Sequence, residues 1–233
     1  MRKILIAVMA MVSMFWFATP THATLWDKGG GLIYDDYLKI TWLQDANYAK
    51  TSGYNIDGRM DWDQATTWAA NLVYGGYSDW RLPTTVDGPY VWGYDGTTTG
   101  GYNITTSEMG YMYYVNLGNL GYYATNGTFP QPGWGLTNTS FESGGPGGPT
   151  VSFQNLQPDE YWSGTEYSAN PVCAWGIDFS YGDQYDGGKF NDYLAWAVRP
   201  GDSAPIPEPA TMLLLGSGLA GLGLFRRVRR RHG

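Results

Sequence analysis

The side chains that most often carry chemistry are nearly missing from the middle of this chain. Its two histidines, His22 and His232, lie close to the two ends. A domain built from the residues between them lacks the commonest general base and metal ligand, which excludes zinc catalysis and Ser-His-Asp hydrolysis. The single cysteine, Cys173, follows Val172 and precedes Ala174 and Trp175. We interpret it as a core residue rather than a nucleophile.

Carboxylates are the remaining reactive groups. A glycine-rich segment, residues 182–188, predicts a wide turn that contains Asp183 and Asp186 and is followed by Asp192. Because a turn also offers carbonyl oxygens, these three residues form a candidate calcium site, with ordinary turn chemistry as the alternative explanation. No other cofactor is expected. A glycosidase that uses a pair of carboxylates stays open, although no spacing singles out a pair.

The N-terminus has the pattern of an export signal. Arg2 and Lys3 precede an apolar stretch, residues 4–18, and Thr21-His22-Ala23 places small residues where a signal peptidase cuts. We predict a signal peptide over residues 1–23, with cleavage between Ala23 and Thr24. A membrane anchor or a buried first helix is the alternative, which the short apolar run disfavours.

The C-terminus forms a second segment, residues 203–233. After a linker over 203–206, Pro207, Glu208 and Pro209 open an apolar run, residues 210–225, and an arginine-rich end follows over 226–231. No polar face interrupts the run, so it predicts a short transmembrane helix in the inner membrane rather than a buried amphipathic one. The arginines would hold the C-terminus on the cytoplasmic side.

The segment between these ends is strongly acidic. From Thr24 to Pro207 it has seven basic and 20 acidic residues, a balance of −13. Such a charge disfavours binding to DNA, RNA or anionic lipid, and no nucleic-acid partner is expected. It permits divalent cations and neutral sugars.

One domain is predicted over residues 24–202. Asp61 and Gln64 form a capping-box pattern that starts a helix over 62–72, and Ser107 caps a second helix. The other expected elements are short strands and long irregular loops: strands at 31–34, 38–42, 161–166, 174–180 and 193–199, and loops at 85–106 and 118–158. Two helices and a late antiparallel sheet make an α+β domain.

Several segments of this domain are recognisable. They recur in order, at 41–48, 62–72, 75–84, 161–167 and 195–201, and they resemble the Lcl C-terminal domain family of bacterial extracytoplasmic proteins. The resemblance implies a C-type-lectin-like α+β fold and, for some members, adhesion to surfaces or polysaccharide. Members commonly run from the Arg-Leu-Pro-Thr motif almost directly into a helix, whereas here residues 85–106 intervene. We call this segment the insertion and expect ligand contacts there first.

The most specific part of the resemblance is the family motif Asp79-Trp80-Arg81-Leu82-Pro83. Its tryptophan and arginine could contact a ligand. However, such a pair before a proline can equally anchor a loop by stacking and by bonding carbonyls or a carboxylate, and we favour this structural role.

The tail in turn resembles the PEP-CTERM sorting signal, which implies processing by an exosortase-type protease in a Gram-negative bacterium. Together these observations predict an exported, envelope-sorted surface or matrix protein without enzymatic activity. We expect extracellular polysaccharide as its ligand. The alternatives are a glycoside-processing enzyme and a structural envelope protein without a small ligand.

Overall fold

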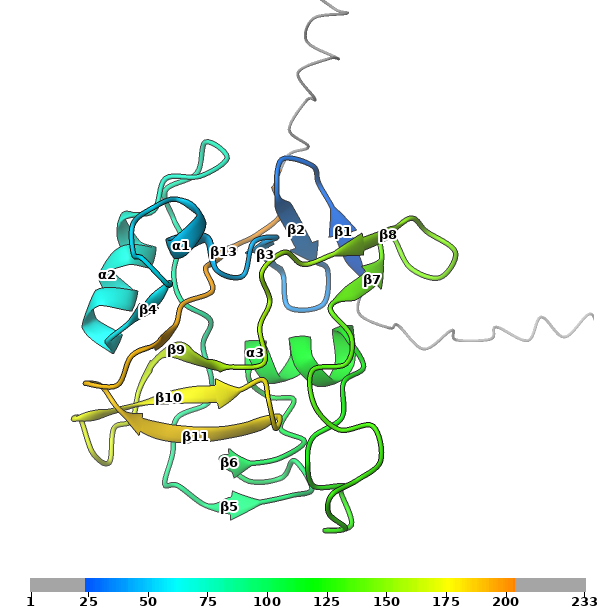
Figure 1. Ribbon diagram of the computed structural model, residues 1–233, viewed down its shortest axis with the longest axis vertical. Helices are drawn as coiled ribbons and strands as arrows, with labels where there is room; N and C mark the ends of the chain where they lie inside the picture. Colours follow the sequence, from blue (N-terminus) through cyan, green and yellow to red (C-terminus); the bar gives the residue numbers. More distant parts are fainter. Residues whose placement is uncertain (1–23, 204–233) are drawn as a thin grey trace, which may run out of the picture.

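The computed structural model describes residues 24–203, and most of its regular structure is β-sheet (Figure 1). A four-stranded sheet has the order β1-β2-β3-β13, a seven-stranded sheet the order β4-β12-β9-β10-β11-β6-β5, and β7 and β8 form a hairpin. The strands are β1 (Leu25–Asp27), β2 (Leu32–Asp35), β3 (Ile40–Leu43), β4 (Arg59–Met60), β5 (Trp92–Gly93), β6 (Gly100–Gly101), β7 (Ser140–Glu142), β8 (Thr150–Ser152), β9 (Glu160–Glu166), β10 (Cys173–Asp178), β11 (Asp183–Gly188), β12 (Tyr193–Leu194) and β13 (Val198–Pro200).

The helices are few and short. They are α1 (Tyr48–Thr51), α2 (Trp62–Asn71), α3 (Glu108–Tyr111) and the π-helix η1 (Met112–Asn116). In α2, Asp61 Oδ1 accepts a hydrogen bond from the Gln64 amide at 2.8 Å, as the capping pattern predicts. Ala65, Trp68 and Ala69 bury the predicted face of this helix.

The second expected helix is only partly α-helical. The Ser107 hydroxyl caps it by accepting from the Gly110 amide at 3.0 Å. After one α-helical turn the backbone widens into η1, and Leu117 donates to the carbonyl of Met112, five residues back. Gly118, at φ 66°, then ends the segment.

The two halves of the chain meet in the four-stranded sheet. β1, β2 and β3 form an antiparallel meander, and β13 from the far end of the domain pairs with β3, with Val198 opposite Trp42. Trp196 lies fully buried just before β13, where its indole donates to the Leu43 carbonyl at 2.7 Å. The sheet therefore closes the domain by joining its first and last strands.

Two strand predictions are wrong in this region. The segment 182–188, expected as a wide turn, is strand β11, which pairs in register with all of β10. Its glycines are typical of turns, but Gly187 packs here against the ring of Tyr193, a contact that a larger side chain would block. The expected strand 193–199 divides into β12 and β13, which belong to different sheets.

The expected fold class is therefore corrected. The domain is mostly β-sheet with few helices, and its sheets contain strands from the beginning of the domain as well as from its end. The expected arrangement of two helices and a late antiparallel sheet is therefore wrong. The predicted C-terminal transmembrane helix, 210–225, lies outside the described residues, as does the signal peptide. Within residues 24–203 no helix is long and apolar enough to cross a membrane.

Candidate functional site

Strands β5 and β6 lie at one end of the molecule (Figure 1), and eight aromatic side chains of the segments around them contact one another. They come from the insertion, from the segment 118–135 and from the turn before β11. We call them the aromatic surface: Trp92, Tyr94, Tyr102, Tyr122, Tyr123, Phe129, Trp134 and Tyr181. Each ring centroid lies between 4.4 and 6.3 Å from that of at least one neighbour, so the rings form one continuous array.

Several of these rings face solvent. Trp92 is 48%, Phe129 55% and Tyr181 44% exposed. The Tyr181 ring stacks on Trp134 with an angle of 17° between the planes, and Trp92 meets Tyr123 edge-on at 5.5 Å. Contiguous exposed apolar area of this kind on a soluble domain usually marks a binding surface.

Side-chain amides hold the two aromatic segments together. Asn103 Nδ2 donates to the carbonyl of Tyr94 at 2.6 Å and to that of Tyr123 at 2.9 Å, which joins the insertion to the segment 118–135. Gln184 Nε2 on β11 donates to the Thr99 carbonyl at 2.8 Å and anchors the insertion to the large sheet. The rings are therefore carried on a fixed backbone, which limits the entropy lost when a ligand binds.

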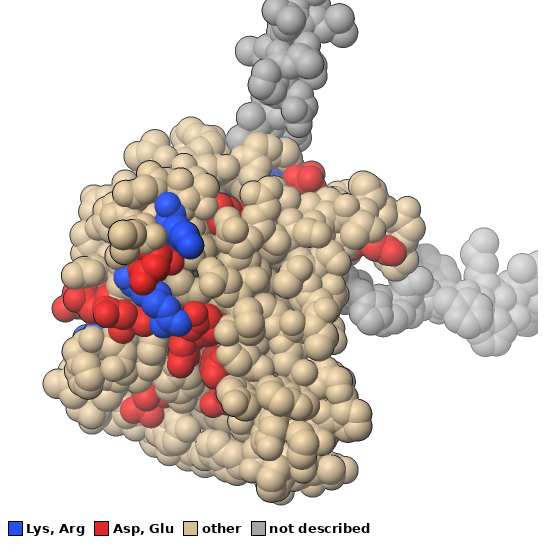
Figure 2. Space-filling view, viewed as in Figure 1, with Lys and Arg blue, Asp and Glu red and all other residues tan. Residues whose placement is uncertain are grey.

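The aromatic surface carries little charge. Residues 118–135 include no Asp, Glu, Lys or Arg, and the insertion includes only Asp87 and Asp95. Asp87 accepts from the indole of buried Trp175 at 2.9 Å. Figure 2 shows that most charged side chains on this face lie beside α2 and β9–β11, with a few acidic ones near β1–β2 and the β7–β8 hairpin. An aromatic surface with so little charge suits a neutral ligand.

The family motif has two buried side chains, Trp80 and Leu82, and an exposed Asp79. Trp80 is 3% exposed, and its indole donates to the Tyr77 carbonyl at 3.2 Å. Asp79 accepts two bonds from Arg199, at 2.7 and 3.0 Å, and this contact holds the pKa of the Asp79 carboxyl below its usual range. Leu82 is buried, and the Pro83 carbonyl accepts from Gly164 on β9. These contacts support the structural role expected for the motif.

Arg81 closes the base of the insertion. Its guanidinium forms two bonds of 2.7 Å to the Glu108 carboxylate, which also accepts from the Thr84 amide at 2.7 Å. The Glu108 amide donates back to the Thr84 carbonyl at 3.0 Å. We call these contacts the clamp: they join the residue before the insertion to the start of α3.

The family model of the Lcl C-terminal domain matches residues 31–199, which is most of the chain. The chain belongs to the Lcl C-terminal domain family. No curated protein and no solved structure matches it.

The tail of this Lcl-domain chain matches a second family model. Residues 205–231 match the PEP-CTERM protein-sorting motif, as the resemblance predicted. The motif is a sorting signal recognised by exosortases, which indicates export and sorting to the cell envelope. Pro207, Glu208 and Pro209 lie within it but outside the described residues.

The three aspartates predicted as a calcium site do not come together. Asp183 and Asp186 are three residues apart on β11, so their side chains leave opposite faces of the sheet. Asp192 is exposed beyond the end of that strand. Within residues 24–203 no group of three or more His, Cys, Asp or Glu side chains is placed to hold a metal ion.

Asp183 instead belongs to a row of carboxylates across three strands. It pairs with Asp178 on β10, and Asp178 pairs with Glu160 on β9. Burial, together with the negative charges of Asp178 and Glu160, raises the pKa of Asp183 to about 6.

Cys173 also has a structural setting. It begins β10 and is partly exposed, and burial, with Asp186 nearby, raises the pKa of its thiol. A raised pKa lowers the fraction of reactive thiolate, which agrees with a residue that is not a nucleophile. The expectation that Cys173 is a core residue is wrong, because the residue is partly exposed at the start of β10.

Proposed function

We propose that this exported Lcl domain is a non-enzymatic module that binds polysaccharide through the aromatic surface. The observation that carries the proposal is the continuous and nearly uncharged array of partly exposed rings that the insertion and the segment 118–135 bring to one end of the domain. The C–H faces of sugar rings are apolar and weakly positive, so they pack on the electron-rich faces of aromatic side chains. The amides and hydroxyls between the rings can bond sugar hydroxyls.

A neutral polysaccharide fits the surface better than an acidic one. The domain carries a balance of −13, which opposes the approach of uronic acid or sulfated chains. The aromatic surface also offers no arginine or lysine to bond such groups. The test is binding of the protein to an array of neutral and acidic glycans, combined with an assay for their hydrolysis. Turnover that a single Asp or Glu substitution abolishes would replace this proposal with a carboxylate-pair glycosidase.

Replacing Trp92 or Phe129 by alanine is expected to weaken glycan binding by about tenfold each. Covering one such ring removes roughly 50 Å² of apolar area from water, worth about 1–2 kcal/mol. Affinity electrophoresis in gels that contain the polysaccharide measures the change. Phe190→Ala is the matched control, because Phe190 is 82% exposed and lies outside the aromatic surface. If all three variants lose binding equally, the aromatic surface is not the site.

The sorting motif leads to a second test, at the C-terminus. We propose that an exosortase-type protease cuts close to Pro207. Mass spectrometry of the protein from its native host should then find a product that starts at Thr24 and ends near Pro207, without the five tail arginines. An intact C-terminus through Gly233 in surface-located protein would contradict the cleavage.

A further inference from the structure

The chain enters the fold at Thr24, directly after the predicted cleavage site of the signal peptide. Thr24 lies opposite Asp36, one position beyond the pair of Leu25 and Asp35. The Asp36 amide donates to the Thr24 carbonyl at 3.1 Å. In a regular antiparallel pair the Thr24 amide would donate back to the main-chain carbonyl of Asp36, but it donates to Asp36 Oδ1 at 2.7 Å. The first nitrogen of the predicted mature chain therefore contacts a carboxylate.

This carboxylate is held at the end of β1. While Oδ1 accepts from Thr24, Oδ2 accepts from the indole of Trp26 at 3.3 Å. Asp36 itself is half-buried in the turn that follows β2. Because β1 supplies both donors, the carboxylate already lies where it would meet a positive charge on the Thr24 nitrogen.

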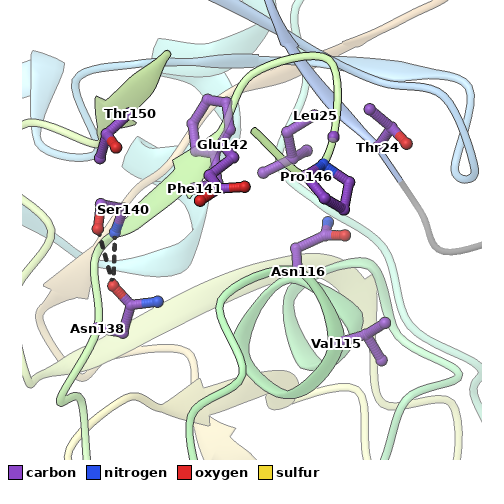
Figure 3. Close-up of a pocket in the computed structure, with 11 residues that line it drawn as sticks. Thr24, Leu25, Val115, Asn116, Asn138, Ser140, Phe141, Glu142, Pro146 and Thr150 are labelled. Carbon is purple, nitrogen blue, oxygen red and sulfur yellow. Dashed lines mark hydrogen bonds between the residues drawn. The ribbon is translucent and has the colours of Figure 1, made fainter. Parts of the chain in front are cut away.

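Thr24 also lines a cavity of about 510 Å³ between the start of β1, the hairpin β7–β8 and η1 (Figure 3). Figure 3 shows Thr24 beside Leu25, on the side of the cavity where Pro146 of the hairpin lies. Glu142 lines the same cavity, and none of the described residues in its lining is basic. A cation at Thr24 would therefore have space for water and a negative surrounding, both of which favour the charged form.

Four other titratable residues lie close to Asp36. Asp35 is fully buried at the end of β2, and Lys39 is exposed in the turn after it. Tyr37 stacks on Tyr111 of α3 with 4.5 Å between the ring centroids, and burial raises the pKa of Tyr111 to about 12. These groups are the same whether or not the signal peptide is attached, so the charge that changes at this site is that of the Thr24 nitrogen.

Cleavage turns this nitrogen from an amide into an amine. A signal peptidase hydrolyses the bond between Ala23 and Thr24: the C–N bond breaks, water gives its hydroxyl to the Ala23 carbonyl carbon, and its remaining hydrogen goes to the Thr24 nitrogen. The new carboxyl group then loses a proton. The new amine, with an ordinary pKa of about 7.7–8.0, takes one up near neutral pH. A charged donor bonds a carboxylate more strongly than a neutral amide does.

We propose that removal of the signal peptide creates an ion pair between the α-ammonium group of Thr24 and the carboxylate of Asp36, which fixes β1 on the four-stranded sheet. The mature domain is thereby more stable than the same domain with residues attached before Thr24. The proposal rests on the predicted cleavage between Ala23 and Thr24. It is independent of glycan binding and of cleavage near Pro207.

The test compares a chain that starts at Thr24 with one that carries Gly-Ser-Gly-Ser before Thr24, both ending at Gly233 and in the same detergent. The four added residues move the ammonium group up to about 13 Å away and leave a neutral amide at Thr24. We expect the chain that starts at Thr24 to melt about 1–3 °C higher at about pH 7. An ammonium group paired in the folded state has a raised pKa, so its stabilisation is complete below its unfolded pKa and is lost as the pH rises through the folded value. The difference should therefore vanish by about pH 10.

Asp36→Asn, made in both chains, tests the partner. The asparagine oxygen can still accept from Thr24 but carries no charge, so the difference between the two chains should disappear. Asp27→Asn is the matched control, because Asp27 is an exposed carboxylate at the other end of β1, and the difference should remain. Equal melting temperatures at about pH 7 would overturn the proposal, as would a difference that persists at about pH 10 or in Asp36→Asn. Mature protein from the native host that starts at a residue other than Thr24 would overturn it too.

Discussion

Replacing Trp80 by alanine is expected to lower the free energy of unfolding by about 3–5 kcal/mol. The ring is 3% exposed, meets Tyr74 edge-on at 6.1 Å, and bonds the Tyr77 carbonyl through its indole. Alanine would leave a cavity beside Asp79 and Arg81, which connect this segment to Arg199 and Glu108. Urea or thermal unfolding measures the loss.

The control for this experiment is Phe190→Ala, which removes a ring that is mostly in solvent and should cost little. A Trp80→Ala variant with the native melting temperature and no glycan binding would show that the motif serves the ligand rather than the fold.

Replacing Asp183 by asparagine is expected to stabilise the domain at neutral pH, by up to about 3 kcal/mol. The folded pKa of about 6 lies above the usual value of 3.8 for this carboxyl, so the folded state binds the proton more tightly than the unfolded chain. The native chain therefore keeps full stability from this group below about pH 4 and loses it as the pH rises through about 6. Asparagine carries no charge and avoids the loss.

Denaturant unfolding of both proteins between about pH 4 and about pH 8 measures this effect. The difference between the Asp183→Asn variant and the native chain should grow with pH and level off above about pH 7. Two other carboxyl groups also have raised pKa values: Glu160, mainly because of its contact with Asp159, and Asp35, because of burial. Both are present in the two proteins, so subtracting one curve from the other removes their contributions. A difference that stays constant with pH would contradict the raised pKa of Asp183.

Local signals in the sequence predicted local structure well. Asp61 and Ser107 each cap a helix start where expected, because a cap depends on residues three positions away. Strand β11 was missed because its glycines resemble a turn until Tyr193 and β10 pack against them. The pairing of β13 with β3 joins residues far apart in sequence, and no local pattern encodes it.

The candidate site was half predictable. Ligand contacts were expected in the insertion because its presence departs from the family pattern. The segment 118–135 was expected only as a loop, although it combines Tyr122, Tyr123, Phe129 and Trp134 with a complete lack of charge. Aromatic residues in a loop without charged residues were the signal that could have identified this segment as part of the candidate site. The three aspartates were misleading because the expected turn is a strand, whose alternation separates two of them.

The clamp has a consequence for how this domain can diversify. Arg81, Thr84 and Glu108 fix both ends of the insertion by direct bonds, so the chain leaves and re-enters the fold at one place. The closure entropy of a loop between such fixed ends grows only slowly with its length. Changes of length are therefore best tolerated in the turn between β5 and β6, because β6 pairs with β11 and Ile104 is buried. The clamp keeps the two ends of the insertion together while this turn varies.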